Sequence, residues 1–127
     1  MHIGHPSGLA DSACPALVRA ANREQSFLAT AAKRLASNDE GNLEALGDAL
    51  EDSGGRIGAV GVHDPELRRI QGDYKDMFGR AASGARKLVS GLRSKDEAGV
   101  RAAKQGLGTL GADESRIAHE LGAYCRR

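Results

Sequence analysis

Apolar residues recur at helical spacing along most of the chain. In the segment 38–60 they are three, four or seven residues apart and comprise Leu43, Leu46, Leu50, Ile57 and Val60. Similar stripes mark residues 15–36, 64–92 and 95–124. A stripe with this period is typical of the buried face of an amphipathic helix. The pattern therefore predicts four helices over these ranges.

Two similar turns connect the helices in pairs. Residues 35–45 and 92–102 align with each other, and both contain the pattern Ser-x-x-Glu, which is typical of a capped helix N-terminus. Each turn follows one helical stripe and precedes another, so each is expected to close an αα-hairpin. Asp64 followed by Pro65 marks the start of the third helix, because Asp is a favoured cap and Pro a favoured first residue.

The number and order of these elements predict the fold. Short connections make neighbouring helices antiparallel, so we expect an all-α chain that forms a single up-down-up-down antiparallel four-helix bundle built from two αα-hairpins. A chain of 127 residues is long enough for one such domain. We assign the bundle to residues 14–127 and a flexible N-terminal head to residues 1–13.

Glycine is frequent, with 17 residues, many of them inside the predicted helices. Gly47, Gly54 and Gly61 recur every seven residues beside the apolar stripe, where a missing side chain lets neighbouring backbones approach closely. Close packing and a compositional bias both explain this pattern. The adjacent pair Gly54 and Gly55 is where we expect a kink or local unwinding.

Composition narrows the class of protein. Aromatic residues make up only 3% of the chain and Trp is absent, so the core is expected to consist of Leu, Ile, Val and Ala, as in helix bundles. A formal net charge of +1 provides no general attraction to nucleic acid or to anionic membranes. No segment approaches the roughly 20 apolar residues that a membrane span needs. We therefore expect neither a nucleic-acid partner nor a membrane span.

Charge is distributed unevenly along the chain. Residues 39–56 carry six acidic side chains against one basic one, whereas the helices expected on either side carry a basic surplus. This complementarity favours contacts within the bundle that determine the helix order. The alternative is a basic surface for an anionic partner near the two turns, formed by Lys33, Arg34, Arg86, Lys87, Arg93 and Lys95.

A polar layer is expected inside the bundle. Glu24 and Glu114 occupy core positions where an aliphatic residue is usual, and both lie at a similar height above the cysteines near the chain ends. Ser53 and Tyr74 reach the same height on the other two helices. Two facing carboxylates would raise one pKa or share a proton, a cation or a ligand. The layer is therefore a candidate ligand-binding site, and the alternative is a purely structural hydrogen-bonded layer.

No motif of a known enzymatic chemistry occurs in the sequence. A phosphate-binding glycine loop, a nucleophile elbow and a His–Cys pair are all absent. There is no C-x-x-C-H pattern for covalent haem, and no metal-ligand spacing exists among the histidines, which are His2, His5, His63 and His119. We therefore expect that the protein is not an enzyme and has no metal and no cofactor.

Two cysteines lie near the two ends of the predicted bundle. Cys14 opens the first helix and Cys125 closes the last, and an even number of helices returns both to the same end. We expect a disulfide between them, which indicates an oxidising, extracytoplasmic compartment. No export signal is visible in residues 1–14, so this compartment requires a signal absent from the sequence. Free cysteines would instead indicate the cytoplasm.

These observations predict a non-enzymatic helical-bundle module that acts through contact with a protein partner or a small ligand. One alternative is a sensor or carrier that binds a ligand or cofactor in the polar layer formed by Glu24, Ser53, Tyr74 and Glu114. Another is a cytosolic assembly subunit whose cysteines stay reduced.

Overall fold

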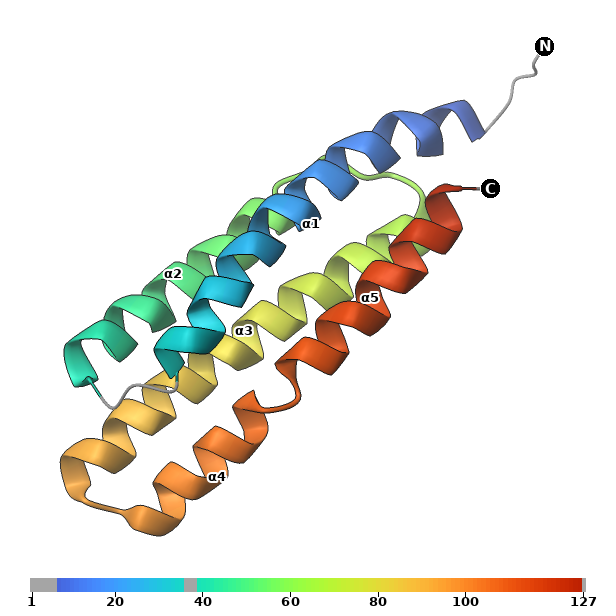
Figure 1. Ribbon diagram of the computed structural model, residues 1–127. Coiled ribbons are helices and arrows are strands. Elements are labelled where there is room, and N and C mark those ends of the chain that lie inside the picture. The colour runs from blue at the N-terminus through green and yellow to red at the C-terminus, as the bar shows by residue number, and fades with distance from the viewer. Residues whose placement is uncertain (1–6, 36–38, 127) are drawn as a thin grey trace.

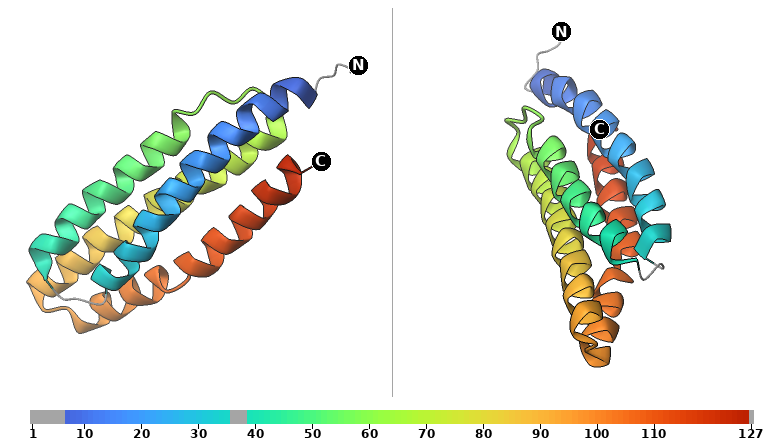
Figure 2. Two further views of the ribbon diagram at one scale, coloured as in Figure 1. Left: turned by 45° about the horizontal axis from the view of Figure 1, so that its top comes forward. Right: turned by 90° about the vertical axis from the view of Figure 1, so that its left-hand side faces the viewer.

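Five helical segments build a four-helix bundle in which α4 and α5 together form the fourth arm (Figure 1). The computed structural model describes residues 7–35 and 39–126. Successive arms run in opposite directions, as two further views show (Figure 2). The predicted fold class is therefore confirmed. The helices are α1 (Ser7–Leu35), α2 (Glu40–Gly58), α3 (Pro65–Ser94), α4 (Glu97–Leu107) and α5 (Leu110–Cys125).

Three helices begin at an aspartate that caps them. Asp39, Asp64 and Asp96 each accept a hydrogen bond from the backbone amide three residues later, at distances of 2.9–3.0 Å. The expected start of α3 at Asp64 is confirmed, but the Ser-x-x-Glu interpretation is wrong for the second turn, where Ser94 is the last residue of α3. The carboxylate of Asp96 is a better cap here because it also interacts favourably with the helix dipole. The N-cap of α2 is likewise Asp39 rather than Ser37, which lies outside the described residues.

The first helix begins earlier than the apolar pattern indicated. It starts at Ser7, so that Pro15 lies inside the helix rather than at its first position. The helix therefore includes residues 7–13, which we assigned to a flexible head, whereas residues 1–6 lie outside the described residues. Ala13 and Cys14 are both buried, and their packing against the bundle compensates for the hydrogen bond that Pro15 cannot donate.

The fourth arm is interrupted, so the single helix predicted over 95–124 is wrong. α4 ends at Leu107 and α5 begins at Leu110, with Gly108 and Thr109 between them. Gly106 and Gly108 are both exposed, and glycine inside a helix lowers its stability, which favours the break here. The kink expected at Gly54 does not occur, because α2 runs unbroken through that position.

Glycines of α2 allow it to pack closely on α3. A Cβ atom added to Gly54 would lie 3.2 Å from Cβ of Phe78, and one added to Gly47 would lie 3.3 Å from Cγ of Arg86. These distances are shorter than ordinary carbon–carbon contacts. Close packing therefore explains these two glycines, whereas Gly61, with no atom near its missing Cβ, has no such role.

Ion pairs along the same α2–α3 interface match the charge pattern of the sequence. Two arginines of α3 each bridge two acidic side chains of α2, which supports complementarity within the bundle over a binding surface at these two arginines. The pairs join Arg86 to Asp48 and Glu51, and Arg93 to Glu40 and Glu44. Being exposed, each pair contributes little to stability, but together they favour one helix order.

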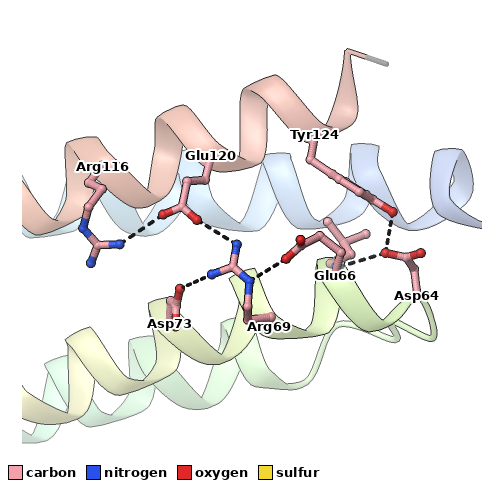
Figure 3. Close-up of polar contacts among 8 residues, drawn as sticks. Asp64, Glu66, Arg69, Asp73, Arg116, Glu120 and Tyr124 are labelled. Carbon is pink, nitrogen blue, oxygen red and sulfur yellow. Dashed lines mark hydrogen bonds and ion pairs between the residues drawn. The ribbon is translucent and has the colours of Figure 1, made fainter.

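The opposite end of the bundle is held by a disulfide and by polar contacts. Cys14 and Cys125 are bonded, with a Cα–Cα distance of 5.7 Å, which confirms the predicted pairing. Arg69 on α3 pairs with Glu120 on α5 at 2.8 Å, and the Tyr124 hydroxyl donates a 2.5 Å hydrogen bond to Asp64 (Figure 3). This end of α5 is therefore tied to both α1 and α3.

Candidate functional site

All four residues of the predicted polar layer are buried. Their exposed fractions are 2% for Glu24, 0% for Ser53, 1% for Tyr74 and 7% for Glu114. The periodicity therefore placed them on the correct helix faces. The structure does not join them into one network, however, and they divide into two pairs with different surroundings.

Arg56, which was not predicted from the sequence, completes the hydrogen bonding of the first pair, Glu24 and Ser53. The Ser53 hydroxyl donates to the Glu24 carboxylate at 2.7 Å, and Arg56 donates twice to the same carboxylate at 2.8 and 3.0 Å. Arg56 lies three residues after Ser53, so its position on the same helix face was the signal that could have identified it. The pair is fully hydrogen-bonded and has no need of a ligand.

Electrostatics agree with this description of the first pair. Hydrogen bonds from Arg56, assisted by Ser53, hold the pKa of Glu24 below its ordinary value, against the opposing effect of burial. Glu24 is thus an ionised carboxylate at neutral pH with a cation beside it. The Arg56 side chain is 56% exposed, so its guanidinium reaches the surface while it neutralises a buried acid. We assign this half of the layer a structural role.

The second pair, Tyr74 and Glu114, has no comparable hydrogen-bond partner among the described residues. Within residues 7–35 and 39–126, no side chain or backbone group makes a hydrogen bond or ion pair with the Glu114 carboxylate or the Tyr74 hydroxyl. Burial raises the pKa of Glu114. Burial, together with the nearby charge of Glu114, raises the pKa of Tyr74. Buried polar groups are nearly always hydrogen-bonded, so this pair is the exception that requires an explanation.

Glu114 lies in the wall of an open cleft of about 710 Å³. We call it the α1–α5 cleft, because one wall is α1 and the other is formed by α4, the helix break and α5. Its residues are Gln25, Leu28, Ala29, Leu35, Lys104, Leu107, Gly108, Leu110, Gly111, Glu114 and Ser115. Small residues on both walls leave the space open: a Cβ added to Gly111 would meet no atom within 4 Å.

The surroundings of the cleft are mostly apolar. Leu28, Leu107 and Leu110 are each at least nine-tenths buried and supply hydrocarbon surface to its walls. Lys104 lies at an exposed position of the cleft, and Gln25 and Ser115 are exposed and uncharged. A cleft of this size with few polar groups is typical of small-molecule sites. Glu114 is the one ionisable group buried in its wall.

Other functional features are few in the described part of the chain. No group of three or more His, Cys, Asp or Glu side chains there could hold a metal ion. None of the described helices is long and apolar enough to cross a membrane. Of the basic residues near the turns, Arg86 and Arg93 are occupied by acids of α2.

Comparison with known proteins adds no relative, since no family model, curated protein or solved structure matches this chain. The function is therefore argued from the geometry of the cleft and its buried acid.

Proposed function

We propose that the protein is a non-enzymatic, extracytoplasmic helical-bundle module that binds a small, mostly apolar ligand in the α1–α5 cleft. The observation that carries this proposal is the buried Glu114 carboxylate, which lies in the cleft wall without a hydrogen-bond partner among the described residues. A ligand with a suitable polar group would supply that partner, and its apolar part would cover the leucines of the walls.

The two carboxylates of the layer differ in whether the cost of their burial is offset. Hydrogen bonds from Arg56 and Ser53 offset the desolvation cost of burying Glu24, so this carboxylate needs no ligand. Glu114 has no compensation, and an isolated buried carboxyl lowers stability by about 1–3 kcal/mol relative to a hydrogen-bonded one. A residue that destabilises the unliganded protein is typical of a binding site, where stability is exchanged for recognition.

The disulfide supports the extracytoplasmic part of the proposal. Disulfides persist in oxidising compartments and are rare in the reducing cytoplasm. The Cys14–Cys125 bond ties α1 to α5 at one end of the bundle, and these are two of the helices that border the cleft. The bond therefore restricts how far the cleft walls can move apart when a ligand enters.

A binding assay with a neutral apolar dye tests the proposal. N-phenyl-1-naphthylamine becomes fluorescent in apolar surroundings, and we expect it to bind the folded protein saturably at one site. Gly111→Phe fills the cleft without a backbone clash, because no atom lies within 4 Å of the position of the new Cβ, and should weaken binding at least about tenfold. Gly79→Phe is the matched control, an exposed helical glycine outside the cleft with equally free space.

Two results would contradict the proposal. One is an absence of saturable dye binding to the disulfide-bonded protein. The other is equal binding to the wild type, Gly111→Phe and Gly79→Phe, since it would place the dye outside the cleft. Far-UV circular dichroism of each variant confirms that the bundle remains folded during the measurement.

A further inference from the structure

We infer that the α1–α5 cleft selects ligands that carry a primary amine on an apolar body, with the ammonium group held by Glu114. This inference rests on the proposed function and specifies the chemical class of the ligand. It starts from Glu114, a buried carboxyl in the cleft wall that has no hydrogen-bond partner among the described residues.

The charged residues that line the cleft favour a cationic ligand. The acid in its wall is buried, whereas its basic residue, Lys104, is exposed to solvent. Charges in water are screened strongly and buried ones weakly, so Glu114 dominates the field inside the cleft. The other polar side chains that line the cleft are uncharged: Gln25 from α1 and Ser115 from α5. The cleft therefore favours a cation beside Glu114 and disfavours an anion.

The same polar layer already contains one carboxylate that is bound to a cation. In its closed half, Glu24 is satisfied by the cationic Arg56 and by the hydroxyl of Ser53. The open half contains a carboxylate and a hydroxyl, Glu114 and Tyr74, but no cation. An ammonium group from a ligand would take the place that Arg56 occupies in the closed half.

The number of hydrogen bonds that Glu114 can accept also favours an ammonium group. An ammonium has three donors, and both carboxylate oxygens of Glu114 are acceptors. A hydrogen bond between two ionised groups is roughly twice as strong as one between neutral groups. An alcohol offers only one neutral donor, and a carboxylate would place a second negative charge beside Glu114. Amines should therefore bind more tightly than alcohols or acids with the same hydrocarbon chain.

Competition against bound N-phenyl-1-naphthylamine, with octylamine, octanol and octanoate near pH 7, tests the inference. We expect octylamine to displace the dye at roughly tenfold lower concentration than octanol, and octanoate to be the weakest. Glu114→Gln should abolish the preference for octylamine while dye binding persists. Asp76→Asn removes one exposed acid outside the cleft and should leave the preference unchanged.

The pH dependence provides a second readout. Burial raises the pKa of Glu114, so lowering the pH toward about 4 should protonate this carboxyl and weaken octylamine binding, while octanol binding changes little. The opposite outcomes are distinguishable. Equal displacement by octylamine and octanol, or a preference for octanoate, overturns the amine inference and leaves the proposed function standing. A dye that does not bind in the cleft overturns both.

Discussion

The two buried glutamates should respond to the same substitution with opposite signs. Glu24→Leu removes a carboxylate that accepts hydrogen bonds from Ser53 and Arg56, whereas Glu114→Leu removes one that has no partner among the described residues. Both side chains are more than nine-tenths buried, so each leucine enters a comparable environment in one layer of the bundle. The comparison therefore isolates the effect of the partners.

The expected magnitudes follow from the contacts. Hydrogen bonds to a charged group contribute about 1.5–3 kcal/mol each, but Arg56 is half-exposed and regains water when Glu24 is lost, so we expect Glu24→Leu to destabilise by about 2 kcal/mol. Glu114→Leu removes an uncompensated desolvation penalty and should stabilise by about 1–2 kcal/mol at neutral pH. In a domain of this size, 1 kcal/mol corresponds to roughly 3–5 °C in Tm.

The effect of pH separates ionisation from packing. The folded pKa of Glu114 is raised, so the penalty for its ionised form is absent below the ordinary carboxyl pKa of 4.5 and develops as the pH rises through the raised value. The gain from Glu114→Leu should therefore shrink toward about pH 4. The folded pKa of Glu24 is lowered, so its contribution is complete above 4.5 and persists until the pH falls through the lowered value.

Guanidinium unfolding followed by far-UV circular dichroism, with the disulfide intact, measures these changes at about pH 7 and about pH 4. The reasoning is refuted if Glu114→Leu destabilises the protein at neutral pH. It is also refuted if the gain is the same at both pH values, because the effect would then arise from packing rather than from the buried charge. Similar losses for both variants would mean that the two halves of the layer are equivalent.

Two further predictions concern stability. Replacing Cys14 and Cys125 by Ser opens a loop whose ends are 111 residues apart and should lower stability by up to about 5 kcal/mol in the chain-entropy model, measured by guanidinium unfolding. Two free thiols in the native protein under non-reducing mass spectrometry would refute both the disulfide and the extracytoplasmic proposal. Gly55→Ala should increase the free energy of unfolding by up to about 1 kcal/mol and raise Tm accordingly, since no atom lies within 4 Å of the new Cβ. Gly91→Ala should instead destabilise by about 1–3 kcal/mol, because its Cβ would lie 3.1 Å from the backbone nitrogen of Val100; equal effects would contradict this packing argument.

Several features were determined by the sequence alone, because they depend on local geometry. The helical period places Glu24 and Glu114 on buried faces, whatever partners they find. Asp64 and Pro65 begin a helix through contacts within one turn. An even number of antiparallel arms returns Cys14 to Cys125, since hairpin topology alone brings the chain ends together.

Only the tertiary structure decided which of these residues acquire partners. Helical period specifies a face and a height, but not the rotation and spacing of helices that lie far apart in sequence. Packing of α1 against α2 brings Arg56 to Glu24, whereas the break between α4 and α5 and the small residues near it leave Glu114 facing an open cleft. Two glutamates that look alike in the sequence therefore differ in the fold: one is neutralised within the chain, and the other is available to a ligand.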